Sequence, residues 1–111
     1  MKIDYKSNRL KKTVKDAKAI MKYYGTRAKL VNKRIEELKA AKDLSDIGKM
    51  PQANCHELIN NKKGELAVDI SGNHRIIFIP DHDPPPTKED GGLDWSQVTQ
   101  IKILNIGEDY H

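Results

Sequence analysis

The sequence predicts an α+β domain in which a helical hairpin packs on a small antiparallel sheet of about four strands. Three observations lead to this prediction: apolar residues recur at helical spacing early in the chain, they alternate at strand spacing later, and turn-forming residues separate these segments. The chain has 111 residues and is expected to form one domain over 1–111. We expect the helical hairpin at about 7–47, the sheet at about 65–106 and a loop at 81–92.

The N-terminal segment is predicted to be a short strand followed by a helix. Lys2 to Tyr5 alternates polar and apolar residues, and Ser7 or Asn8 can cap the helix that follows. The helix has one apolar stripe, made of Leu10, Val14, Ala17, Met21 and Tyr24. Its lysines fall largely outside the stripe: Lys11, Lys12, Lys15, Lys18 and Lys22.

A second helix is predicted after Gly25, which interrupts the first pattern. Thr26 can cap it. Its apolar stripe begins at Leu30 or Val31 and continues through Ile35, Leu38, Ala41 and Leu44. Gly48 and Pro51 end the helical region, so the two helices form a hairpin with basic outer faces.

The second half of the chain has the period of a β-structure. Alternation from Leu66 to Ile70, a Ser71-Gly72-Asn73 turn and a second apolar run predict a β-hairpin over 65–79. Both faces of its second strand are apolar, which is typical of a central strand. Pro80 ends that strand, the proline-rich acidic segment 81–92 is an exposed loop, and a last strand runs from about Val98 to Ile106.

Charge is distributed unevenly along the chain. Residues 1–49 hold 15 Lys and Arg against 6 Asp and Glu, whereas residues 50–111 hold 5 against 10. A basic half favours a polyanionic partner, with a solvated lysine-rich helix pair as the plain alternative. The single cysteine, Cys55, excludes an internal disulfide and a cysteine-based zinc site. Without a signal sequence or an apolar stretch of roughly 20 residues, we expect a soluble cytoplasmic protein.

Five residues could supply proton transfer and charge stabilisation at a phosphodiester. They are His56 in the link before the hairpin, Arg75 within an apolar strand, and Asp109, Tyr110 and His111 at the end of the last strand. Lys62 and Lys63, in a polar turn, could add positive charge. Each also has a plain interpretation, as an ordinary surface residue, a solvent-facing strand arginine or a solvated turn. The four histidines lack ligand spacing, so we expect no metal and no cofactor.

The stretch from His56 to Phe78, together with the ending Asp109-Tyr110-His111, resembles the HigB-like plasmid maintenance killer toxins of the RelE/ParE superfamily. The shared pattern is a histidine, a lysine- and glycine-containing turn, an aliphatic strand, a Gly-Asn turn, and an arginine before an aliphatic-Phe strand. The resemblance covers essentially the whole chain. It implies a type II toxin that cleaves mRNA on the ribosome and is silenced by a small helix-turn-helix, HigA-like antitoxin, through which the pair reaches operator DNA.

The resemblance also implies roles for individual residues. His56, Arg75, Asp109, Tyr110 and His111 match positions implicated in metal-independent cleavage by a ribose 2′-OH. The basic helices would hold ribosomal RNA. Ile59 replaces the lysine that the family often has, Asn60 replaces a glycine, and the 81–92 loop is long. Two alternatives follow: a ParE-like inhibitor of gyrase without catalysis, and a decayed toxin that only binds its antitoxin.

Overall fold

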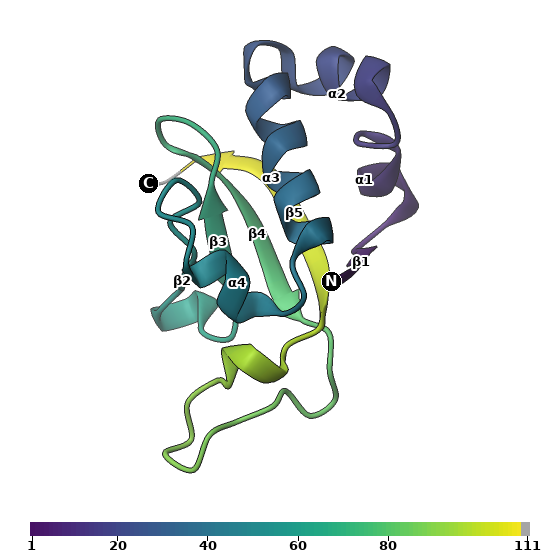
Figure 1. Ribbon diagram of the computed structural model, residues 1–111. Helices are drawn as coiled ribbons and strands as arrows, with labels where there is room; N and C mark the ends of the chain where they lie inside the picture. Colours follow the sequence, from purple (N-terminus) through teal and green to yellow (C-terminus); the bar gives the residue numbers. More distant parts are fainter. Residues whose placement is uncertain (110–111) are drawn as a thin grey trace.

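The computed structural model describes residues 1–109, with the backbone alone at Glu108 and Asp109. The sheet has the strand order β1-β5-β4-β3-β2, and α3 crosses one of its faces (Figure 1). The strands are β1 (Lys2–Tyr5), β2 (His56–Glu57), β3 (Leu66–Asp69), β4 (His74–Pro80) and β5 (Gln100–Asp109). The helices are α1 (Asn8–Lys12), α2 (Ala17–Tyr24), α3 (Ala28–Ala40) and α4 (Leu44–Gly48).

The sheet confirms the predicted α+β class and differs from it in two ways. It has five strands rather than about four, because the link at His56 pairs with β3 as the short strand β2. It is also mixed rather than antiparallel, because β1 runs parallel to β5. A two-residue strand has too few residues for an alternating pattern to be visible in the sequence. The predicted central strand is β4, which lies third of five.

The first predicted helix is divided in two. Asp16 accepts a hydrogen bond from the Ala19 amide at 2.8 Å and starts α2 afresh after a bend. The bend changes the buried face: Ala19 and Ile20 are buried, whereas the predicted stripe residues Ala17 and Met21 are exposed. Of the two predicted caps, Ser7 and Asn8, the structure shows Ser7, whose hydroxyl accepts from the Leu10 amide at 3.1 Å.

The helix α3 carries the main apolar contact with the sheet. Val31, Ile35 and Leu38 are almost completely buried, as their spacing predicts. The predicted Thr26 cap is wrong, because a 3₁₀ turn over Gly25–Arg27 leads into α3 and no side chain caps it. Leu44 is buried too, but it belongs to the separate helix α4, which Asp43 caps through the Ser45 amide.

One face of the sheet forms the hydrophobic core with these helices. The strand residues in this core are Leu66, Val68, Ile70, Ile76, Phe78, Ile101 and Ile103. Side chains alternate between the two faces of a strand, so the intervening residues of β3 and β4 point to the opposite face. These helices therefore pack on one face of the sheet, and Ala67 and Ile77 on the opposite face are buried as well.

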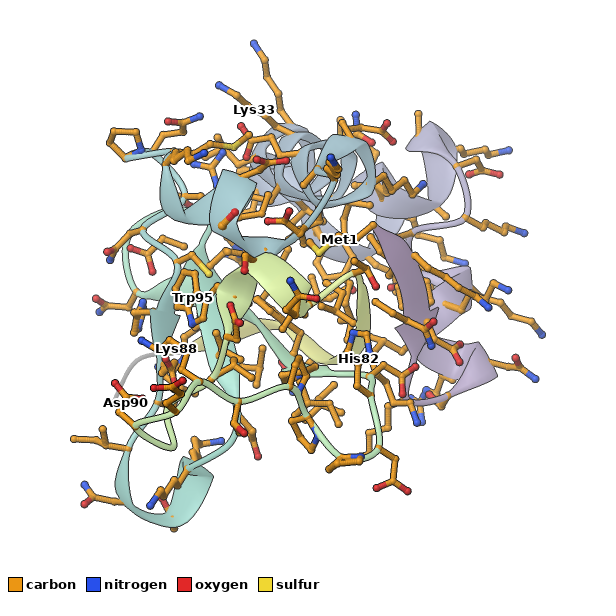
Figure 2. The ribbon with its side chains drawn as sticks, turned by 60° about the horizontal axis from the view of Figure 1, so that its bottom comes forward. Met1, Lys33, His82, Lys88, Asp90 and Trp95 are labelled. Carbon is orange, nitrogen blue, oxygen red and sulfur yellow. The ribbon has the colours of Figure 1, made fainter. Side chains whose placement is uncertain are left out.

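The segment between β4 and β5 crosses the end of the domain as a loop, as predicted for 81–92. It contains one isolated bridge, Thr87 to Leu93, and a 3₁₀ turn, η3 (Trp95–Gln97). His82 Nε2 accepts from the Thr99 amide at 3.2 Å, and Trp95 Nε1 donates to Glu57 Oε2 at 3.1 Å. These anchors lie on opposite sides of the view in Figure 2. The loop and the end of β5 lie at opposite ends of the sheet (Figure 1).

None of the helices in residues 1–109 is long and apolar enough to span a bilayer.

Candidate functional site

The face of the sheet opposite α3 carries the described candidate groups. One cross-strand row consists of His56, Ala67, Ile77 and Asn105, on β2, β3, β4 and β5. The next row consists of Asp69, Arg75 and the register position of Glu108. From strand spacing and rise, the Cα atoms of His56 and Arg75 are about 12 Å apart. This separation lets their long side chains approach one small group from two sides.

His56 is half-buried in β2, and its orientation is set by the backbone before it. Its Nδ1 lies 2.7 Å from the carbonyl oxygen of Asn54. A carbonyl oxygen only accepts hydrogen bonds, so Nδ1 carries the proton in this arrangement. The ring is therefore held by the chain rather than turning freely in solvent.

Arg75 is buried, with 8% of its surface exposed, although it lies at the start of a strand. Its register partners are Asp69 on β3 and Glu108 on β5. The plain interpretation of a solvent-facing strand arginine is therefore wrong for this chain. A buried guanidinium on a polar face can stabilise negative charge more strongly than one in water, because the local dielectric constant is lower.

The C-terminal group is only partly covered by the structure. Asp109 pairs with His74 in the ladder between β5 and β4, one position from the pair of Arg75 and Glu108. The backbone of the last strand thus reaches the end of β4 at which Arg75 lies. Tyr110 and His111 lie outside the described residues.

Gly107 shapes the end of β5. It has a φ of +86° and lies at a register shift, so β5 carries an extra residue opposite the step from Arg75 to Ile76. The His74 Nδ1 lies 3.3 Å from the Gly107 carbonyl oxygen. Such bulges bend a strand and re-aim the residues beyond it. The bend here falls immediately before Glu108 and Asp109.

A buried hydrogen-bond network behind this face was not predicted from the sequence. Arg34 of α3 is 5% exposed; it donates through Nε to the Asp69 carbonyl and through Nη2 to the Gln52 carbonyl, both at 2.7 Å. Its Nη1 contacts Glu37 Oε1 at 3.1 Å. One available signal was the position of Arg34 beside Ile35 in the apolar stripe, where a charge is expected only when it is paired.

The predicted basic residues lie on two separate surfaces. Lys11, Lys15, Lys18 and Lys22 are exposed on α1, α2 and the bend between them. A groove there is lined by four lysines and Tyr23, with Asp16 as the acidic residue; the lysines are Lys12, Lys15, Lys18 and Lys22. Lys62 and Lys63 lie at the end of the 3₁₀ turn η2 (Asn60–Lys62).

A second basic groove was missed by the sequence analysis. Lys6 and Arg9 line it together with Leu104, Asn105 and Ile106 of β5. Asn105 also belongs to the row that contains His56. The groove therefore connects Lys6 and Arg9 with the face opposite α3. This connection depends on the pairing of β1 with β5, which the sequence alone does not show.

The neighbour of His56 in the sequence has the opposite environment. Cys55 packs against the core, and burial raises the pKa of its thiol from 9.0 to about 12, with a smaller contribution from Glu57. The thiol is therefore protonated at neutral pH and is a poor nucleophile. The candidate group at this position is therefore His56 rather than Cys55.

Comparisons with known proteins were made at the level of sequence and of structure. No protein-family model and no curated protein matches the sequence. The structure is similar to the YoeB/ParE toxin from Agrobacterium tumefaciens, with a TM-score of 0.57 and 11% identity over 99% of this chain and 100% of that one. It is also similar to the YoeB dimer from Staphylococcus aureus, with a TM-score of 0.54 and 16% identity over 99% and 98% of the two chains.

A third similar structure is the YoeB-YefM complex from Staphylococcus aureus, with a TM-score of 0.53 and 15% identity over 99% of this chain and 98% of the matched chain. At these identities the likeness establishes the fold. This chain has the fold of the YoeB/ParE toxins.

Proposed function

We propose that this chain is the toxin of a type II toxin–antitoxin pair and that it cleaves mRNA on the ribosome. The observation that carries the proposal is the placement of His56 and Arg75 on the face of the sheet opposite α3. The last described residues of β5 lie beside β4 at the end that carries Arg75. The fold agrees with this function, since the similar structures are described as YoeB and YoeB/ParE toxins.

The proposed reaction is attack of a ribose 2′-oxygen on the adjacent phosphorus. His56 accepts the 2′-OH proton, the P–O5′ bond breaks, and the leaving 5′-oxygen takes a proton from the C-terminal group of Asp109 and His111. The products are a 2′,3′-cyclic phosphate and a 5′-hydroxyl. Arg75 stabilises the negative charge of the phosphorane, and Tyr110 stacks on a base. Proton carriers and a guanidinium suffice for this scheme, which uses no metal.

The two basic grooves are proposed to hold RNA at a distance from the cleaved bond. Lys11, Lys15, Lys18 and Lys22 would contact ribosomal RNA, while Lys6 and Arg9 would guide the message toward Asn105. Lys62 and Lys63 would add contacts beyond β2. Each phosphate contact releases counterions, so affinity should fall steeply with added salt.

The decisive experiment is cleavage of a defined mRNA on translating ribosomes by purified protein. Arg75→Ala, His56→Gln and deletion of His111 should each lower the single-turnover rate by about 10²–10⁴. His82→Gln is the matched control, because His82 lies in the loop at the far end of the sheet, and it should retain the wild-type rate. Intact mRNA on ribosomes saturated with the wild-type protein would refute the nuclease proposal.

The same experiment separates the alternative functions. Growth arrest with intact mRNA and accumulated DNA breaks would identify a ParE-like gyrase inhibitor. Harmless expression of the wild-type chain without a partner would identify a protein that only binds its antitoxin.

The proposed partner is a small antitoxin encoded beside this gene. One similar structure is a YoeB-YefM complex, which supports an antitoxin partner in general. The HigB-like pattern from His56 to Phe78 favours a HigA-like helix-turn-helix protein that carries the operator binding. Sequencing the neighbouring reading frame and co-purifying its product would distinguish a helix-turn-helix antitoxin from a YefM-like one.

A further inference from the structure

We infer that Asn54 is a positioning residue that fixes His56 in the tautomer whose lone pair lies on Nε2. The inference rests on the proposed function for its catalytic meaning, because it makes His56 the base of the proposed reaction. The tautomer itself follows from hydrogen bonds among described residues and can be tested without any substrate.

The first step is the contact at Nδ1. The Asn54 carbonyl oxygen lies 2.7 Å from His56 Nδ1 and can only accept a hydrogen bond. The neutral ring therefore carries its proton on Nδ1 and its lone pair on Nε2. If the proton were on Nε2 instead, two lone pairs would face each other across this contact. The backbone of Asn54 thus selects between the two neutral forms of the ring.

The second step is the reason why this carbonyl points at the ring. Asn54 has a φ of +44°, a left-handed conformation that asparagine tolerates better than most residues. Its side-chain Nδ2 donates to Asp69 Oδ2 at 2.9 Å. The preceding carbonyl, of Ala53, accepts from the Asp69 amide at 2.8 Å. The turn before β2 is thus attached to the end of β3 at two adjacent positions.

The third step connects this attachment to the second group of the candidate site. Arg34 donates to the Asp69 carbonyl and to the Gln52 carbonyl, so the network also fixes the chain ahead of Asn54. Asp69 is the register partner of Arg75. The residue that orients His56 is therefore held by the residue that pairs with Arg75. Asn54 sets the position of the imidazole relative to the guanidinium as well as its tautomer.

A role for the tautomer follows from the chemistry. A base that accepts the 2′-OH proton needs a lone pair on the nitrogen that faces the substrate, whereas an acid needs a proton there. With Nδ1 protonated against the Asn54 carbonyl, Nε2 is the nitrogen that accepts. Asn54 thereby presents the neutral imidazole to the substrate with an accepting Nε2, as the base role proposed for His56 requires.

The test uses ¹⁵N nuclear magnetic resonance of the imidazole ring at a pH where the ring is neutral. The His56 signals are identified by their loss in His56→Gln. The wild-type ring should show a protonated Nδ1 and an unprotonated Nε2. Asn54→Ala removes the hydrogen bond from the Asn54 side-chain amide to Asp69 and disfavours the left-handed backbone. It should therefore shift the ring toward the Nε2–H form. Asn54→Gly can keep the left-handed backbone and loses only the side-chain hydrogen bond to Asp69, so a smaller shift is expected.

The matched control is Asn60→Ala. Asn60 is the other described non-glycine residue with a positive φ, at +61°, and it lies in the turn after β2. Its replacement costs similar backbone strain but should leave the His56 ring signals unchanged. If Asn54→Ala does not fold, Asn54→Gly carries the test. A wild-type ring protonated on Nε2, or a wild-type tautomer retained in both Asn54 variants, overturns the inference.

The activity measurement separates this inference from the proposed function. In the ribosome assay Asn54→Ala should lower kcat about tenfold with KM unchanged, a fraction of the 10²–10⁴ expected from the base itself. A tautomer shift with a normal kcat would overturn the catalytic half of the inference while the nuclease proposal stands. Absence of cleavage by the wild-type protein would refute the nuclease proposal, and the ring signals would still decide the tautomer.

Discussion

The two faces of the sheet are built from the same strands and have opposite properties. The face under α3 is aliphatic and closed, with Phe78 and Ile76 almost completely buried. The opposite face carries His56, Asp69, Arg75 and Asn105 around two buried apolar residues, Ala67 and Ile77. The contrast teaches that apolar burial on one face stabilises the fold, whereas specific hydrogen bonds hold the other face in place. Substitutions on the two faces should therefore have different effects.

The largest effect is expected from breaking the apolar face. Phe78→Ala should lower the free energy of unfolding by about 3–5 kcal/mol, because it leaves a cavity between the sheet and α3. Asn105→Ala, on an exposed position of the opposite face, should change it by less than about 0.5 kcal/mol. Urea unfolding followed by circular dichroism measures both. Equal losses would show that the two faces do not differ in this way.

Cys55 and His56 sharpen the comparison, since adjacent residues face opposite environments. With its pKa at about 12, the native Cys55 thiol should react with iodoacetamide near pH 8 roughly a thousandfold more slowly than the unfolded chain, because its thiolate fraction is that much smaller. Because the unfolded thiol ionises at a lower pH than the buried one, the free energy of unfolding should fall as the pH rises from about 9 toward 12. Equal alkylation rates in native and urea-unfolded protein would contradict the burial of the thiol.

Substitution of Arg34 tests the hydrogen-bond network that holds the face opposite α3 in place. Arg34→Met keeps the aliphatic stem and leaves the carbonyls of Asp69 and Gln52 without this donor, which should cost about 2–3 kcal/mol. Lys33→Met is the control: Lys33 extends away from the domain into solvent (Figure 2), so its loss should change stability by less than about 0.5 kcal/mol. Chemical denaturation of both variants makes the comparison, and an Arg34 variant as stable as the wild type would refute a structural role for the network.

The smallest expected effect lies at the bulge of β5. Gly107→Ala should cost about 1–2 kcal/mol, because the left-handed φ of +86° disfavours a side chain. Gly91→Ala has a similar φ of +90° but lies in the exposed loop, where the chain can readjust, so it should cost less than about 1 kcal/mol. Thermal unfolding of the pair isolates the contribution of the sheet, and the reverse order would mean that the bulge is not held rigidly.

The apolar face could be predicted from the sequence more fully than the polar one. Val31, Ile35 and Leu38 recur at helical spacing, and Leu66, Val68 and Ile70 at strand spacing, so periodicity alone places them in the core. The division at Asp16 escaped prediction because Ala17 and Met21 continue the earlier spacing although the chain bends. Asp16 caps a new helix at this bend, so the apolar spacing of the first helix does not continue, and Ala19 and Ile20 are the buried residues.

The polar face depends on pairings between distant segments, which the sequence does not display. His56 and Arg75 could be named from their chemistry, and β4, the predicted central strand, pairs with the last strand. The placement of Asn54, Arg34 and Lys6 could not be foreseen, because each lies beside a segment 15 or more residues away: Asn54 contacts Asp69, Arg34 contacts Gln52, and Lys6 lines a groove with β5. The roles of Tyr110 and His111 stay predictions.

The anchored loop at the far end of the domain has a practical consequence. Because His82 and Trp95 fasten its two ends to Thr99 and Glu57, the stretch between them can be replaced without pulling on β4 or β5. A fluorophore or a short affinity epitope inserted near Gly91 would report on binding to the proposed ribosomal target. It would leave the carboxyl end of the chain, which a conventional fusion would occupy, untouched.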